Sequence, residues 1–194
     1  MKRWILAIAS LTVLGTVSAQ PKLDSLLVYG QGFAFSVKEP DGWIGDTEHA
    51  GMYQANALFY PKAQDWNDTD GLIRVRIGDK SDENVEEDLA ADMNGYRQQH
   101  PNIQFRELAV THPKYRVYPK VFLVPNEFYE YVAYVNPSPK SKYLFSVAMN
   151  KRKREATKNE LDALGKVIAS LESLGAPQQG VPADRTRPAG SSGR

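Results

Sequence analysis

The chain has 194 residues, a formal net charge of +1 and no cysteine. The near-neutral charge argues against a nucleic-acid-binding protein, which usually carries a strong basic excess on its folded domain. The lack of cysteine excludes a disulfide framework, a thiolate metal site and a thiol nucleophile.

Residues 1–19 have the layout of a secretory signal peptide. Lys2 and Arg3 supply a positive start, residues 4–17 are uncharged and mostly apolar, and Ala19 is a small residue at the expected cleavage site. This run falls short of the roughly 20 apolar residues that a membrane span needs. We therefore expect export to the periplasm or the medium, cleavage after Ala19 and no stable membrane span in the mature chain. An uncleaved N-terminal anchor is the alternative.

The end of the chain marks a second change in composition. Residues 175–194 are rich in glycine and proline, and Val181 is their only large aliphatic residue. Such a segment cannot bury enough apolar surface to offset its ordering entropy. We expect a disordered tail over 175–194 and a single domain over 20–174. A tail that reaches a cell-wall or protein partner is the alternative.

The first half of the chain predicts strands separated by turns. Apolar residues alternate over 33–37 and over 73–77, and another strand is expected over 52–60. The sequence Pro-Asp-Gly at 40–42 predicts a turn, because proline presets φ and glycine accepts a positive φ. Trp43 follows this turn directly, so we expect its ring to be a core anchor rather than a ligand contact.

Charged residues accompany the strand over 73–77 and the helix that follows it. Arg74 and Arg76 give the strand a cationic outer face. A helical period predicts a helix from Asn84, the first residue of a capping-box pattern, to about Gln99. Acidic residues crowd this region: Asp79, Asp82, Glu83, Glu86, Glu87, Asp88 and Asp92. The early ones suit the positive end of the helix dipole, and we interpret the rest as a solvated face, with a recognition patch as the alternative.

The second half predicts four strands and a closing helix. The strands are expected over 103–110, 115–124, 128–135 and 142–149. The helix opens with a second capping box, Thr157 with Glu160, and Gly175 is placed as its C-terminal cap. Short connections favour antiparallel pairing. The fold class is therefore α+β, a mostly antiparallel sheet flanked by two amphipathic helices in an α/β/α sandwich.

The early Phe-x-Phe strand and the turn of Pro40, Gly42 and Trp43, followed by strands, a helix, more strands and a helix, resemble the PsbP/Mog1-like superfamily of secreted α/β/α sandwich domains. The resemblance covers residues 25–174. It implies a binding or accessory role rather than catalysis, and it supplies no catalytic residues.

No motif predicts catalysis or a cofactor. His49, His100 and His112 match no zinc-site spacing, so we expect surface histidines and no metal site. The acidic loop from Asp65 to Gly71 fails the EF-hand pattern, although a calcium loop of another kind stays open. No nucleophile elbow, phosphate loop or dinucleotide fingerprint occurs. The basic run over 151–154 is interpreted as a solvated connection, with an anion or phospholipid patch as the alternative.

Aromatic residues are the densest feature of the second half. Most are expected in the core, but so many phenols cannot all be buried without partners. The candidate binding groove is therefore an amphipathic face lined by Tyr129, Tyr131, Tyr134 and Tyr143.

These observations favour an exported, non-catalytic accessory domain, expected to be a monomer. Its partner would be an unknown protein or a small apolar or amphipathic ligand, and not a nucleic acid. One alternative is a hydrolase whose site is assembled only in three dimensions. Another is an envelope structural or interaction protein that uses the tail and a sheet edge.

Overall fold

The computed structural model describes residues 25–81 and 84–175. The signal peptide expected over 1–19 and all but the first residue of the expected tail lie outside these residues. The described elements follow in chain order: β1 (Ser25–Gly30), β2 (Phe33–Lys38), β3 (Trp43–Asp46), the 3₁₀-helix η1 (Ala50–Tyr53), β4 (Ala57–Pro61), β5 (Ile73–Asp79), α1 (Val85–Gln99), β6 (Gln104–Arg106), β7 (Arg116–Val124), β8 (Phe128–Asn136), β9 (Tyr143–Arg152), α2 (Lys158–Ser170) and β10 (Glu172–Gly175). No helix in the described part of the chain is long and apolar enough to cross a membrane.

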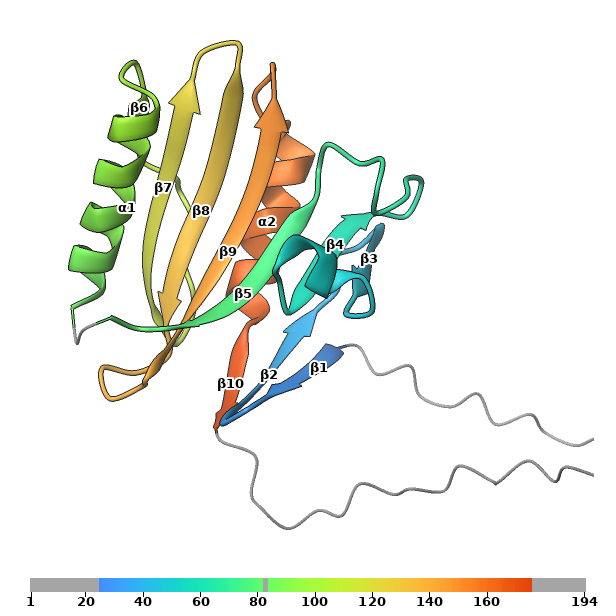
Figure 1. Cartoon of the computed structure of the whole chain (residues 1–194). Helices are drawn as coiled ribbons and strands as arrows, with labels where there is room; N and C mark the ends of the chain where they lie inside the picture. Colours follow the sequence, from blue (N-terminus) through green and yellow to red (C-terminus); the bar gives the residue numbers. More distant parts are fainter. Residues whose placement is uncertain (1–24, 82–83, 176–194) are drawn as a thin grey trace, which may run out of the picture.

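The strands form two antiparallel sheets (Figure 1). A seven-stranded sheet has the order β3-β4-β5-β9-β8-β7-β6, and a three-stranded sheet has the order β1-β2-β10. The predicted α+β class with mostly antiparallel strands is confirmed. The expectation of one sheet is wrong, because β1 and β2 pair as a hairpin and β10 occupies the other edge of β2.

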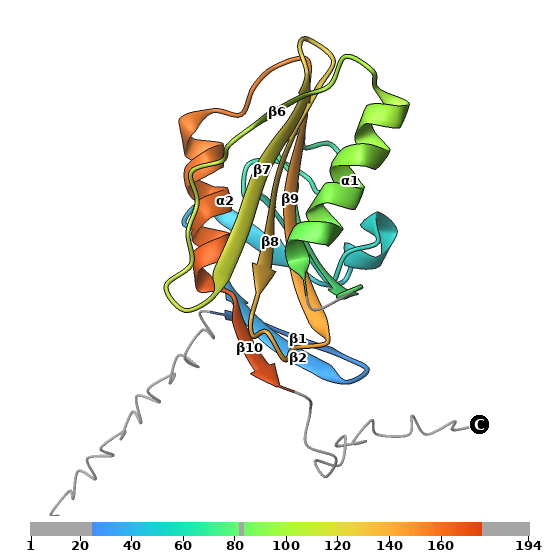
Figure 2. The same ribbon diagram turned by 90° about the vertical axis from the view of Figure 1, so that its left-hand side faces the viewer.

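Alternation along β7, β8 and β9 gives the large sheet two apolar faces, and Figure 2 shows a helix on either side of these strands. The face toward α2 belongs to the main core, which includes Val121, Ala133, Val147, Leu164 and Ile168. The face toward α1 belongs to a smaller cluster, which includes Phe122, Val132, Ala148, Leu89 and Met93. Burial of these apolar side chains is the main favourable term that holds the layers together.

The predicted turn before β3 is confirmed. The Trp43 N–H donates to the Pro40 oxygen at 3.0 Å, and Gly42 has a φ of +79°. The Trp43 ring is buried in the main core. Its position fits the expected anchor role.

Three predicted elements differ from the structure. The strand expected over 52–60 begins only at Ala57, because η1 occupies the preceding residues. The strand expected over 103–110 is confined to Gln104–Arg106. The last helix ends at Ser170, and the chain then turns into β10 to pair with β2. Gly175 is therefore a strand residue rather than a helix cap.

Candidate functional site

A cleft of about 480 Å³ lies between α1 and the large sheet. The apolar stripe of α1 packs over Phe122 and Val132, which belong to β7 and β8. In Figure 1 the helix accordingly lies toward the β6–β7 end of the sheet, and β9 and β5 continue beyond it. We call this hollow the α1 cleft.

Strands of the large sheet form the floor of the α1 cleft, and α1 forms its wall. Strand alternation directs Arg74 and Arg76 of β5, with Glu130 and Tyr134 of β8, away from the α2 core and into the cleft. The wall is formed by α1 residues spaced one helical turn apart: Asp88, Asp92 and Tyr96. The solvated position expected for Asp88 is therefore wrong, because its Oδ2 atom is buried in the cleft. Asp92 also lines the cleft, but it is exposed as expected.

Several polar groups in the α1 cleft are bound to one another. The Tyr96 hydroxyl donates to the Glu130 carboxylate, and the Tyr134 hydroxyl donates to Asp92. Arg74 donates to Glu130 at 3.3 Å and to Asn150 at 2.8 Å. Burial, reinforced by the bound carboxylates, raises the pKa of both Tyr96 and Tyr134. Both phenols therefore keep their protons and act as fixed donors.

Several side chains that line the α1 cleft, Asp79 among them, have no side-chain partner in the described part of the chain, and two of these lie on the floor and on the wall of the cleft. The Arg76 side chain is exposed and makes no hydrogen bond or ion pair with another described residue. The Asp88 Oδ2 atom is buried and accepts no hydrogen bond in the described part of the chain. A buried carboxylate oxygen without a donor is costly, so it needs an explanation. One group is cationic and the other anionic, and they come from β5 and α1 respectively.

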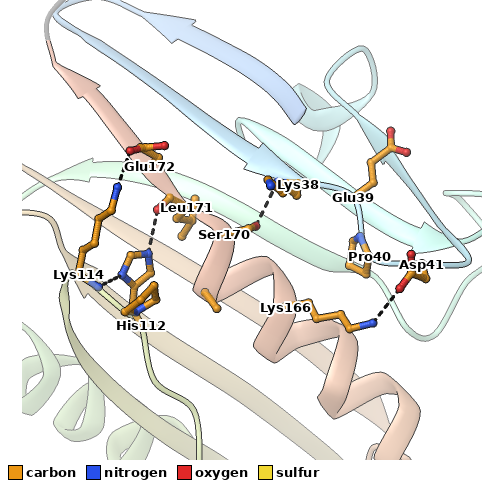
Figure 3. A pocket seen from close by; sticks show the side chains of 12 residues that line it. Lys38, Glu39, Pro40, Asp41, His112, Lys114, Lys166, Ser170, Leu171 and Glu172 are labelled. Atoms are coloured by element: carbon orange, nitrogen blue, oxygen red, sulfur yellow. Dashed lines mark hydrogen bonds and ion pairs between the residues drawn. The ribbon is translucent and has the colours of Figure 1, made fainter. Parts of the chain in front are cut away.

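A second hollow, of about 460 Å³, lies beside the C-terminal end of α2 (Figure 3). Its charged groups are paired at both ends: Lys166 with Asp41 at 3.1 Å, and Lys114 with Glu172 at 2.7 Å. Between these pairs, the Lys38 N–H donates to the Ser170 hydroxyl at 3.0 Å. The contacts in this hollow join β2, α2 and β10 to the loop before β7, which indicates a structural junction.

His112 is fixed within this junction. Its Nε2 lies 2.8 Å from the Leu171 oxygen, and its Nδ1 accepts from the N–H groups of Lys114 and Tyr115, both at 3.0 Å. Burial lowers the pKa of His112, although the Leu171 carbonyl partly opposes this. The imidazole is therefore neutral, with Nε2 as the donor to Leu171 and Nδ1 as the acceptor.

The other two histidines lie in separate places. His49 Nδ1 is 2.7 Å from Asp46 Oδ2, and its ring stacks on Trp66 with centroids 4.4 Å apart. The His100 ring packs against Phe128. No group of three or more potential metal ligands converges within the residues that the structure describes.

The acidic loop and the basic run meet each other in the structure. Asp70 from the loop forms ion pairs with Lys151 at 2.9 Å and with Arg154 at 3.1 Å. The solvated connection expected over 151–154 is therefore wrong for Lys151, which is buried at the end of β9.

The structure does not bring the four candidate groove tyrosines together. Tyr129 and Tyr131 are buried in the main core, on the face toward α2. Tyr134 lies on the opposite face in the α1 cleft, and the Tyr143 hydroxyl donates to the Gln31 oxygen at 3.2 Å. The sequence predicted no cleft here, but two signals mark this surface: the cationic face of 73–77 and Glu130, the single charged residue in an otherwise apolar strand.

No protein-family model matches the chain, and no curated protein does. Among solved structures, the chain is similar to the solution structure of cyanobacterial PsbP (CyanoP) from Synechocystis sp. PCC 6803, with 17% sequence identity and a TM-score of 0.42. The likeness covers 84% of this chain and 98% of that chain. No residue role is carried over from that structure.

Proposed function

We propose that the protein is an exported, non-catalytic accessory domain that binds a small polar ligand in the α1 cleft. The signal-peptide pattern of residues 1–19 supports export. The packing of α1 and α2 on opposite faces of the large sheet supports the α/β/α sandwich expected for such a domain. The observation that carries the proposal is the unpartnered Asp88 Oδ2 atom in the wall of a cleft.

The charges in the α1 cleft specify the chemistry of the ligand. Asp88 offers an acceptor to an ammonium or other donor group, and Arg76 offers a cation to a carboxylate or other anion. A ligand that carries both groups satisfies both residues at once. The volume of about 480 Å³ lies within the roughly 300–1,000 Å³ of known small-molecule sites. We therefore propose a small zwitterion with N–H donors, such as an amino acid or a short peptide.

The remaining contacts of the α1 cleft favour recognition. The bonds from Tyr96 to Glu130 and from Tyr134 to Asp92 join α1 to β8 and hold the wall at a fixed distance from the floor. Binding to a site of this kind avoids part of the entropic cost of ordering side chains.

Titration of the purified chain by calorimetry and by NMR tests the proposal. The expected ligands are free amino acids and short peptides, and matched simple anions and simple cations are the comparison compounds. Binding by zwitterions is expected. Arg76→Ala and Asp88→Asn should each weaken it by about tenfold or more, because each removes a charge-assisted contact. Arg116→Ala, an exposed arginine outside the cleft, is the matched control. Equal binding by the parent and both cleft variants would reject the α1 cleft as the site.

A further inference from the structure

Strand β1 is an unprotected edge of the small sheet. It runs for six residues in unbroken register with β2, and its sequence Ser-Leu-Leu-Val-Tyr-Gly contains no charge and no proline. Its other side pairs with no described strand. Such an edge presents unpaired backbone N–H and C=O groups to another strand.

The other sheet edges carry the features that oppose pairing. β3 has four residues and ends in Asp46, and β6 has three residues and ends in Arg106. β10 begins with Glu172 and is irregular between Ser173 and Gly175. Short, charged or bulged edges resist further pairing. Among the described edges, β1 alone is long, regular and uncharged.

An apolar surface accompanies this open edge. Leu27 is 44% exposed and Tyr29 is 63% exposed, and both point outward from β1 while Val28 between them is buried. Leu174, on the opposite edge strand of the same sheet, is 49% exposed. Within the described residues, the remaining exposed large hydrophobic is Met52, which lies on η1. The exposed apolar side chains are thus concentrated on the small sheet.

We infer that β1 pairs antiparallel with β1 of a second copy of this chain, which joins the two small sheets into one. A two-fold axis at Val28 places Leu27 of each copy opposite Tyr29 of the other. Aliphatic–aromatic pairs of this kind stabilise adjacent strands. Because β1 has no charged side chain, the symmetric register places no like charges opposite one another. This proposal replaces the monomer expected from the sequence.

The Leu27–Tyr29 pairs across the axis and the uncharged sequence of β1 are what favour a second copy over a strand from another protein. The same six residues supply both sides of the contact, as a two-fold interface requires. The paired surface is small, so the association is expected to be reversible and to depend on protein concentration.

Sedimentation equilibrium of the chain beginning at Gln20 tests this inference. The parent should form dimers as its concentration rises. A Leu27→Lys/Tyr29→Lys double variant should remain monomeric, because lysines would then face one another across the axis. Met52→Lys makes the same kind of change on an exposed apolar residue of η1, outside the small sheet, and should associate like the parent. A monomeric parent, or a double variant that dimerises as the parent does, would overturn the inference.

Cross-linking gives a second measurement that needs no change of charge. The chain has no cysteine, so any disulfide must come from introduced residues. A Leu27→Cys/Tyr29→Cys variant should form a disulfide-linked dimer on mild oxidation, because its thiols lie opposite one another across the axis. Met52→Cys is the control. Equal cross-linking of both variants would reject the β1 contact, and so would linkage of the β1 thiols to a different protein in a periplasmic extract.

Discussion

Lys151 is only 1% exposed although it carries a positive charge. Its Nζ lies 2.7 Å from Glu160 and 2.9 Å from Asp70, and Arg154 binds the same two carboxylates. Burial by itself would raise the pKa of Glu160. Hydrogen bonds from Arg154, Lys151 and Thr157 outweigh burial and lower this pKa to about 2. The ion cluster is therefore stable because its carboxylates are charged.

Glu160→Gln removes that charge while keeping a side-chain acceptor at the start of α2. Below its usual pKa of about 4.5, the unfolded state binds a proton that the folded state binds only near pH 2. The contribution of Glu160 is thus complete above about pH 4.5 and is lost as the pH falls toward 2. The variant should lose about 3 kcal/mol at pH 7, since a buried charge is left under-compensated.

Urea unfolding from pH 2 to 7 measures this effect, and the variant should show a weaker dependence of unfolding free energy on pH in the acid range. Glu172→Gln, in the exposed pair with Lys114, is the control and should change stability little. Parallel pH curves for the parent and Glu160→Gln would contradict the assignment.

The sequence predicts part of this cluster. The spacing of Thr157 and Glu160 indicated a cap, and the structure confirms it. The burial of Lys151 could not be predicted, because four consecutive basic residues are typical of a solvated turn. Its inward direction depends on β9 continuing to Arg152, and that extension depends on pairing with Phe128 and Tyr129 of β8.

At the scale of elements, the cap of α2 is a complete capping box. The Thr157 hydroxyl accepts from the Glu160 N–H, and the Glu160 carboxylate accepts from the Thr157 N–H at 2.7 Å. Thr157→Ala should cost about 1 kcal/mol, because an orphan N–H loses its acceptor. Thr157→Ser should restore most of the loss in a thermal or urea melt. A serine variant as unstable as the alanine variant would show that the methyl group, rather than the hydroxyl, matters.

Local periodicity predicted most elements but missed the two edge strands of the small sheet, β1 and β10, and also β3 and η1. The apolar stripe of α2 continues through Leu171 and Leu174, so a helix to residue 174 fits the sequence. In the structure Leu171 leaves the helix with a ψ of 130°, and β10 pairs with β2. β1 lacks strict alternation and was not expected. β10 is determined by a partner distant in the sequence, whereas β1 is determined by its hairpin with the adjacent β2.

At the scale of the whole molecule, β10 is the last element of the folded domain, and it follows α2 directly. Removing residues 176–194 should shift the melting temperature by less than about 2 °C, because this segment has little apolar surface to bury. Removing residues 171–194 also deletes β10 and the buried Leu171. That longer truncation should lower the melting temperature by roughly 10 °C, given a cost of several kcal/mol. A large effect of the shorter truncation would show that the tail docks on the domain.

The candidate site also depends on the whole fold. Arg76 and Asp88 could be named from the sequence as a cationic strand face and an acidic helix, but nothing local indicated that they share a cleft. Their juxtaposition requires β5 to pair with β9, and α1 to pack beyond β9 on the far strands of the sheet.

Strand β2 is held between the first and the last described strands of the chain, with Ser36 paired to both Leu27 and Glu172. The hairpin with β1 can form as soon as the first strands are free, because its two halves are neighbours in the sequence. The contact with β10 closes a loop that spans almost the whole domain, and loops of that length close late and slowly. In a chain that crosses a membrane with its N-terminus leading, the free edge of β2 therefore stays unpaired until the final strand has emerged. If the chain is exported as proposed, emergence of its C-terminal end is the event that completes the fold.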